Sequence, residues 1–247
     1  MSHSSRRILR LHGADVRSFL QGLVTNDVAR VDHGLVYAAM LTPQGKYLAD
    51  FFLKVDGADI LMDVDADQAD MLAQRLTMYK LRADVQITPS DLHLHRGTGA
   101  APEDALPDPR HDALGWRAYR DAPQSDDTVD WNALYVAHLI PQSGVELTPD
   151  SFILEMGFER LGGVDFRKGC YVGQEVTARM KHKTELRKGL AQVALSGDAE
   201  TGTPIMAGDK PAGTLLTRSG DSALAYLRFD RATGEMDAGG ATVARTA

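Results

Sequence analysis

Residues 6–95 carry short apolar runs separated by turn signals, together with two stretches in which apolar residues recur at helical spacing. The first helical stretch starts near Gly13 and places Val16, Leu20 and Val24 on one face. The second spans residues 65–79 and begins with acidic residues, which favour a helix N-terminus. The runs predict strands at residues 6–11, 35–41, 47–55, 59–64, 84–87 and 92–95.

The sequence Thr42-Pro43-Gln44-Gly45 separates two of these strands and predicts a hairpin, since proline presets one turn angle and glycine tolerates a positive φ. This order of elements predicts an α+β fold, with helices on one face of a largely antiparallel sheet. Residues 97–112 are rich in Gly, Pro, Ala and Asp and predict a loop, followed by a strand at 114–119 and a helix at 128–139.

The pattern changes at Leu186, after which short strands at residues 189–195, 213–218, 223–229 and 242–245 alternate with glycine-rich turns. Such a pattern is typical of a small all-β barrel or sandwich. We therefore expect an α+β region of two lobes over residues 1–185 and a β-barrel over residues 186–247.

The composition, with 43% hydrophobic and 25% charged residues, is that of a soluble globular protein. No apolar run approaches the roughly 18 residues that span a bilayer, and the first ten residues carry arginines without the apolar core of a signal peptide. We expect a cytoplasmic protein with no membrane partner.

The net charge of −7 argues against nonspecific nucleic-acid binding, so we do not expect direct tRNA binding. The charge is uneven, because residues 160–188 hold eight basic side chains against three acidic ones. The basic residues are Arg160, Arg167, Lys168, Arg179, Lys181, Lys183, Arg187 and Lys188. We expect this stretch to dock an acidic partner or an anionic cofactor.

The only cysteine, Cys170, lies within this basic stretch. A single thiol forms no internal disulfide and cannot supply the several thiolates of a structural zinc site. Four glycines between residues 162 and 173 predict sharp turns, and residues 174–179 predict a short helix after the cysteine. With Arg167 and Lys168 beside it, the thiol is expected to ionise readily, as nucleophilic attack and metal ligation require.

The run Lys168-Gly169-Cys170-Tyr171-Val172-Gly173-Gln174-Glu175 resembles the K-G-C-[FY]-x-G-Q-E signature of the YgfZ/GcvT-like folate-binding family. Weaker matches in the same order extend the resemblance over about residues 6–190. They include Phe19-Leu20-Gln21-Gly22, Thr25-Asn26-Asp27, Thr42-Pro43-Gln44-Gly45-Lys46 and Tyr79-Lys80-Leu81-Arg82. The continuation through Arg187-Lys188 is similar to the mitochondrial iron–sulfur assembly branch of the family.

The resemblance implies the aminomethyltransferase fold, in which α+β lobes surround a folate-sized central cavity and a C-terminal barrel follows. It also implies a role in assembling or repairing iron–sulfur proteins, including iron–sulfur enzymes that modify tRNA, with iron–sulfur enzymes or assembly proteins as partners. On this basis Cys170 is the reactive thiolate and a candidate shared iron–sulfur ligand. Lys168, Gln174 and Glu175 are its supporting motif residues, and we expect no permanently bound cluster.

The same resemblance implies tetrahydrofolate or a derivative as the ligand. The residues it assigns to folate are Asp50, Trp131, Tyr171, Gly173 and Arg179. The chain departs from the family at two places. The paired acids of the aminomethyltransferases read Ala49-Asp50, and the glycine usual two residues before Pro141 is Leu139.

Two other functions fit the residues. One is a tetrahydrofolate-dependent one-carbon transferase in which Asp50 is the acid or base. The other is a thiol enzyme with Cys170 as nucleophile and His182 or Glu175 as base. Because only one carboxylate of the acid pair remains, we expect an assembly factor rather than a true aminomethyltransferase.

Overall fold

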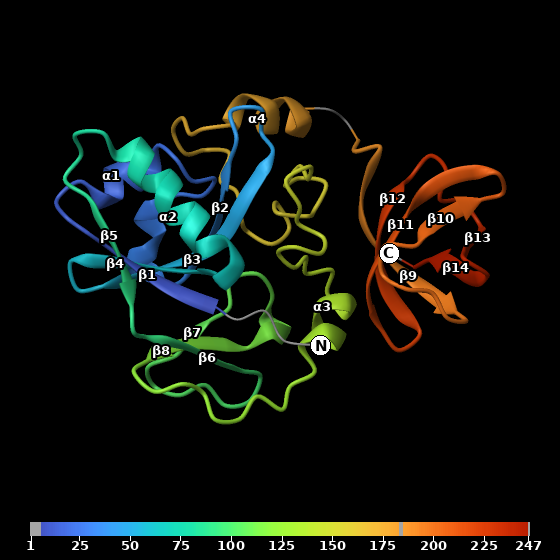
Figure 1. The fold of residues 1–247 in the computed structure, drawn as a ribbon, viewed down its shortest axis with the longest axis horizontal. Coiled ribbons are helices and arrows are strands. Elements are labelled where there is room, and N and C mark those ends of the chain that lie inside the picture. Colours follow the sequence, from blue (N-terminus) through green and yellow to red (C-terminus); the bar gives the residue numbers. More distant parts are fainter. Residues whose placement is uncertain (1–5, 183–184, 247) are drawn as a thin grey trace. The chain divides into compact units, whose positions relative to one another are not determined.

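The computed structural model describes residues 6–182 and 185–246, which form two compact units. The first unit consists of residues 6–129 and 159–176, and the second of residues 130–158, 177–182 and 185–246 (Figure 1). Within the described ranges, no helix combines the length and the apolar character needed to cross a bilayer.

A five-stranded antiparallel sheet with the order β2-β3-β4-β1-β5 forms the centre of the first unit. The strands are β1 (Arg6–His12), β2 (Val36–Leu41), β3 (Tyr47–Asp56), β4 (Asp59–Asp65) and β5 (Gln86–Ser90). The predicted hairpin is confirmed between β2 and β3. There Gly45 takes a φ of +74° and its N–H donates to the carbonyl of Thr42 at 2.8 Å.

The helices α1 (Val16–Gln21) and α2 (Ala66–Lys80) and the 3₁₀ helix η1 (Val28–His33) pack their apolar residues into one core with the sheet (Figure 1). The prediction of a helix at residues 65–79 is confirmed. Asp65 caps its N-terminus by accepting from the N–H of Asp67, and Leu72 and Leu76 are buried. The helix η1 was not predicted, because a single turn with only Val28 and Val31 buried gives too short a periodic signal.

A second, three-stranded sheet with the order β6-β8-β7 completes the first unit. Its strands are β6 (His93–Gly97), β7 (Leu106–Pro107) and β8 (Trp116–Arg120), and the short 3₁₀ helix η2 (Asp112–Leu114) precedes β8. The loop predicted for residues 97–112 is therefore interrupted, since Leu106 and Pro107 pair with Arg117 and Trp116.

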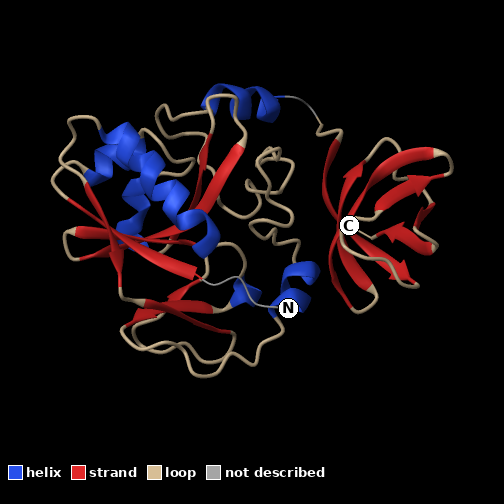
Figure 2. Cartoon of the chain, in the orientation of Figure 1, coloured by secondary structure: helices blue, strands red, loops and turns tan. Residues whose placement is uncertain are grey.

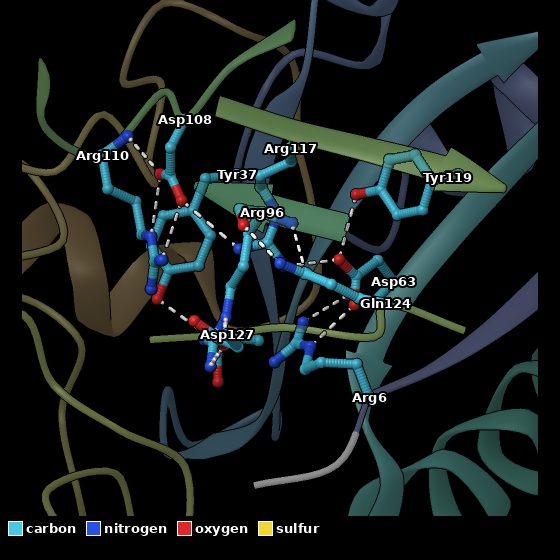
Figure 3. Close-up of polar contacts among 11 residues, drawn as sticks. Arg6, Tyr37, Asp63, Arg96, Asp108, Arg110, Arg117, Tyr119, Gln124 and Asp127 are labelled. Atoms are coloured by element: carbon cyan, nitrogen blue, oxygen red, sulfur yellow. Dashed lines mark hydrogen bonds and ion pairs between the residues drawn. The ribbon is translucent and has the colours of Figure 1, made fainter. Parts of the chain in front are cut away.

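A buried ion network joins the two sheets (Figure 3). Asp63 on β4 contacts the guanidinium groups of Arg6 at 2.7 Å and Arg117 on β8 at 2.5 Å. Arg117 also contacts Asp108 at 3.3 Å, and its guanidinium carbon lies 3.9 Å from the centre of the Phe52 ring. Each buried charge thus has an opposite charge beside it, as burial in a low-dielectric interior requires.

The second unit is a closed barrel with the helix α3 (Trp131–Ala137) and the segment after it. The barrel order is β10-β11-β12-β9-β14-β13, and Figure 2 shows only strands and turns in it. Its strands are β9 (Lys188–Ser196), β10 (Pro204–Ala207), β11 (Lys210–Ser219), β12 (Ser222–Arg228), β13 (Glu235–Ala238) and β14 (Ala241–Arg245). The barrel was predicted, but β10 and β13 were not, because four residues each are too few to show alternation.

Residues 138–158 are fastened to the barrel by two carboxylates. Buried Glu146 accepts from the N–H and the hydroxyl of Thr217 on β11, at 3.1 and 2.6 Å. Glu155 accepts from the hydroxyl of Tyr226 on β12 at 2.6 Å. The compact barrel unit therefore includes chain that precedes residue 186, where the sequence places the start of the barrel.

Candidate functional site

The candidate site is centred on Cys170, whose side chain is exposed. It lies in residues 162–173, which we call the cysteine loop, just before the helix α4 (Gln174–His182). The loop has no regular secondary structure up to this helix. Its position is therefore set by contacts with other parts of the first unit, which fall into two groups.

The first group joins the start of the loop to residues 21–26, which follow from the end of α1. Buried Thr25 donates its hydroxyl to the carbonyl of Gly163 at 2.6 Å, and its own carbonyl accepts from the N–H of Asp165 at 3.0 Å. The amide of Asn26 donates to the carbonyl of Gly162 at 2.6 Å. The start of the loop is thus joined to Thr25 and Asn26 by three hydrogen bonds.

Lys168 extends this connection. Its ammonium donates to the carbonyls of Gln21, Val24 and Asn26 at 2.8, 2.6 and 2.9 Å. Gln21 ends α1, and carbonyls at a helix C-terminus attract a positive charge. Burial lowers the pKa of Lys168 to about 8, against the opposing attraction of Asp27 and Asp165. All three ammonium donors are engaged by the backbone, which gives this motif lysine a structural role that the sequence did not predict.

The second group fixes the end of the loop against the β2–β3 hairpin. Gly173 has a φ of +85°, and a Cβ placed there would lie 2.6 Å from the carbonyl oxygen of Thr42. A Cβ at Gly45, in the turn of the hairpin, would lie 2.7 Å from the Cβ of Val176 on α4. Both positions therefore require glycine for space as well as for φ. The folate contact expected for Gly173 stays a prediction.

The other motif residues flank the thiol on the side of α4. Gln174 is half-buried at the start of this helix, and its N–H donates to the carbonyl of Tyr171 at 3.2 Å. Glu175 is exposed in the first turn, and Arg179 is exposed near the other end. The last turn carries Arg179, Lys181 and His182, whereas Lys183 lies outside the described residues. The last turn of α4 is therefore cationic, whereas Lys168, which the sequence placed on the same docking surface, is engaged by backbone carbonyls instead.

Asp50, the expected acid of the folate site, lies buried on β3 between two tyrosines. Its carboxylate accepts from the hydroxyl of Tyr47 at 2.6 Å and from that of Tyr37 at 3.0 Å. Burial, and then the charge of Asp50, raise the pKa of Tyr37 well above its usual value, so this hydroxyl keeps its proton and donates it. The carboxylate of Asp50 is thus held on β3 by two hydroxyl donors.

The two aromatic residues assigned to folate are buried. Tyr171 belongs to the first unit, where the ammonium of Lys168 lies 5.2 Å from its ring centre. Trp131 belongs to the second unit, in the first turn of α3, with its ring centre 6.2 Å from that of Tyr135. These contacts fit packing roles, and the folate contacts of both residues stay predictions.

One departure from the family sequence falls at a strained backbone position. Leu139, which stands where the family usually has glycine, takes a φ of +50° just after α3. Glycine is the residue that reaches this left-handed region without strain. Leucine holds the same backbone conformation here at a cost of order 1 kcal/mol.

Sequence reasoning missed the hydrogen bonds by which Thr25 and Asn26 support the cysteine loop, and those of Tyr37 and Tyr47 to Asp50. Thr25 and Asn26 were noted only as a weak family match. Polar residues that lie between apolar ones are expected to be buried with hydrogen-bond partners, and this signal was available in the sequence. Tyr37 and Tyr47 sit in strands as ordinary aromatic residues, and no local pattern indicates that both reach Asp50.

Comparisons with known proteins agree with this architecture. The family model described as CAF17, C-terminal beta-barrel domain, matches residues 187–246. The crystal structure of the glycine cleavage system aminomethyltransferase T from Bartonella henselae superimposes with a TM-score of 0.74 at 10% identity, over 98% of this chain and 83% of that one. The predicted aminomethyltransferase-like fold with a C-terminal barrel is confirmed.

The chain is 35% identical over 217 residues to the mitochondrial iron–sulfur cluster assembly factor IBA57 homolog of Mycosarcoma maydis, covering 74% of this chain and 54% of the relative. The chain is thus similar in sequence to the IBA57 assembly factors. The mouse IBA57 is 29% identical over 278 residues, covering 94% of this chain and 78% of its own length. The chain spans about half the length of the fungal IBA57 homologs from Mycosarcoma maydis and Neurospora crassa.

The expected cytoplasmic location is wrong by this comparison. The IBA57 relatives from fungi, mouse and human are named as mitochondrial proteins. The expectation rested on the absence of an apolar span and of a signal-peptide core, and neither absence distinguishes the cytoplasm from the interior of an organelle.

Proposed function

We propose that this protein is an accessory factor in the assembly or repair of iron–sulfur proteins and that it acts through the thiol of Cys170. One observation carries the proposal: the only cysteine is exposed on a loop that hydrogen bonds and close backbone contacts fix at both ends. A fixed and accessible thiol suits a group that must meet a partner's metal centre in one orientation. The IBA57 relatives, named as assembly factors, support the same role.

The proposed chemistry is ligand exchange at iron. Cys170 gives up its proton to solvent, and the thiolate sulfur then coordinates an iron atom in place of a ligand released by the donor. Iron–sulfur clusters take about four cysteine thiolates, and this chain has one. The other ligands must therefore come from a partner protein, a second copy or small thiols, so the contact is transient. The iron–sulfur clients we propose include enzymes that modify tRNA, as in the YgfZ type.

The cationic end of α4 provides the surface for the first contact with such a partner. Arg179 and Lys181 are exposed there, and Arg167 is exposed in the cysteine loop. Opposite charges raise the rate of encounter and set the orientation, and the effect weakens as salt rises. An acidic docking face on the partner would therefore pair with these exposed side chains.

The decisive experiment is complementation in cells that lack this protein. Cys170→Ser is expected to leave iron–sulfur enzyme activities at the level of the deletion strain, because a hydroxyl at neutral pH does not replace a thiolate ligand. Gly169→Ala is the matched control, since a Cβ there meets nothing within 4 Å, and it should complement fully. Full complementation by Cys170→Ser at equal protein level would refute the proposal.

We also propose that a tetrahydrofolate binds near Asp50. The chemistry suits the group in part: pteridine N–H groups are donors, and the carboxylate of Asp50 is an acceptor. When bound, the folate would supply a one-carbon or reducing group, while Asp50 would orient the ring. Calorimetry with tetrahydrofolate should show binding to the wild type that weakens about tenfold or more in Asp50→Asn, the loss of one charge-assisted hydrogen bond. Equal affinity would refute this assignment.

A further inference from the structure

A small exposed surface at the C-terminal end of α2 combines apolar and cationic side chains. We call it the α2-end patch and define it by Arg75, Met78, Leu81 and Arg82. Met78 is 66% exposed and Leu81 is 87% exposed, the two most exposed of the large hydrophobic residues in the described ranges. Met78 lies on the side of the helix away from buried Leu72 and Leu76, and half-buried Arg75 lies three residues before it. Folding leaves this patch uncovered.

The backbone presents Leu81 outward in a strained conformation. Leu81 follows the last residue of α2 with a φ of +45°, where a non-glycine residue costs of order 1 kcal/mol. Its side chain is almost fully exposed, so intrachain packing does not offset this cost. Glycine is the usual residue at such a helix end. The leucine therefore contributes nothing to this fold that glycine would not supply better.

The turn that holds Leu81 is fixed by several hydrogen bonds. The N–H of Ala83 donates to the carbonyl of Lys80 at 2.7 Å, and the ammonium of Lys80 donates to the carbonyl of Val85 at 3.0 Å. Asp84 then pairs with the Gly13–Asp15 turn, since its N–H donates to the carboxylate of Asp15 at 2.9 Å. Because the turn is held in place, Leu81 loses little backbone freedom when it meets another surface.

The charges of the α2-end patch lack partners. In the part of the chain that the structure describes, neither Arg75 nor Arg82 makes a hydrogen bond or ion pair, whereas nearby Arg7 pairs with Asp70 at 2.7 Å. The acid closest to Arg82 in sequence is Asp84, whose carboxylate accepts from the N–H of Ala14 and the side-chain amide of Gln86. Two uncompensated guanidiniums thus flank two exposed apolar side chains in a chain whose net charge is −7.

We propose that the α2-end patch docks an acidic segment of a partner protein that presents apolar side chains flanked by carboxylates. Leu81 and Met78 would bury against the apolar side chains, and Arg75 and Arg82 would pair with the carboxylates. A second copy of this chain suits the patch less well, because two molecules of charge −7 repel each other. The surface is small, so the contact is weak and reversible.

The test uses a fluorescein-labelled peptide of glutamates with two leucines four residues apart, and a second peptide in which serines replace the leucines. Fluorescence anisotropy at low salt should show at least tenfold tighter binding of the leucine peptide to the wild type. Leu81→Gly and Arg82→Gln should each weaken that binding at least tenfold. The matched controls Arg30→Gln, another exposed arginine of the first unit, and Val145→Ser, an exposed apolar residue of the second, should bind as the wild type does.

Leu81→Gly separates binding from folding, because it relieves the strained backbone. Its melting temperature should equal or exceed that of the wild type while its binding falls. Equal binding of the two peptides, or unchanged binding in Leu81→Gly, overturns the proposal. So does Leu81-dependent sedimentation with phosphatidylserine vesicles, or Leu81-dependent dimer formation, in the absence of peptide binding. Cys170→Ala should bind the leucine peptide normally, so failure of the cysteine proposal would leave this result unchanged.

Discussion

Replacing Asp63 with asparagine should destabilise the first unit more than any other single neutralisation of a carboxylate there. Asp63 is 1% exposed and touches both Arg6 and Arg117, and Arg117 is itself buried. The variant keeps the shape but removes the negative charge, so Arg117 retains only Asp108 at 3.3 Å. Removing one partner of a buried ion pair leaves an uncompensated charge, and the cost is of order 3 kcal/mol.

The pKa of Asp63 gives a second measure of the same interaction. Burial alone would raise this pKa, but Arg6 and Arg117 outweigh burial and lower it from 3.8 to about 2. At 1.36 kcal/mol for each pH unit, the shift corresponds to about 2 kcal/mol of stability. Because the folded value is the lower one, this stability is fully present above pH 3.8 and is lost as the pH falls towards 2. Asp63→Asn should lack this part of the acid transition.

The assay uses the two tryptophans, one of which lies in each unit. In a Trp131→Phe background the fluorescence reports Trp116 on β8, beside Arg117, so urea unfolding followed at this residue measures the first unit. Asp70→Asn is the control: Asp70 is 86% exposed in its pair with Arg7, and its loss should cost less than about 1 kcal/mol. The reasoning would be refuted if Asp63→Asn lowered the free energy of unfolding by less than about 1 kcal/mol, or if Asp63→Asn and Asp70→Asn lowered it equally.

Three further predictions concern the cysteine loop and the barrel. Lys168→Met should lower the free energy of unfolding of the first unit by about 2 kcal/mol and speed amide exchange in residues 162–168, because three carbonyls lose a charged donor. Arg167→Met should have neither effect. Gly173→Ala should lower the melting temperature of the first unit, since the added Cβ meets Thr42, and Gly169→Ala should leave it unchanged. Burial raises the pKa of Glu146 above 4.5, so the folded barrel holds this proton more tightly than the unfolded chain does. The free energy of unfolding of the barrel should therefore fall as the pH rises through this range. Glu146→Gln should abolish that dependence in urea titrations. A flat pH profile in the wild type would contradict the last prediction.

The sequence predicted the elements whose patterns are long enough to read. The helix over residues 65–79 shows its apolar face over four turns, and the hairpin at Thr42–Gly45 combines proline and glycine between apolar runs. The strands β10 and β13 are four residues each and depend on barrel closure for their partners. Tertiary pairing decides such short elements, and no local signal replaces it.

The candidate site was predicted in its centre but not in its support. Glycines and cations around Cys170 are visible within a few residues of sequence, so an exposed thiol on a turning loop could be expected. The contacts of Lys168 with residues 21–26 could not, because they join positions more than 140 apart and use backbone carbonyls, which every residue has. For the same reason the two tyrosines at Asp50 became evident only when strand register was known.

The long span between Lys168 and its carbonyl partners has a consequence for biosynthesis. Gln21 leaves the ribosome 147 residues before Lys168, which at 5–20 residues per second is a delay of roughly 7 to 30 s. During that interval the sheet and its helices can form. The hydrogen bonds from Lys168 to the carbonyls of residues 21–26, which help to position Cys170, can form only once the lysine has been synthesised. The nascent chain therefore gains its properly presented thiol only after most of the first unit has been synthesised, and a truncated product would not display the sulfur in its working position.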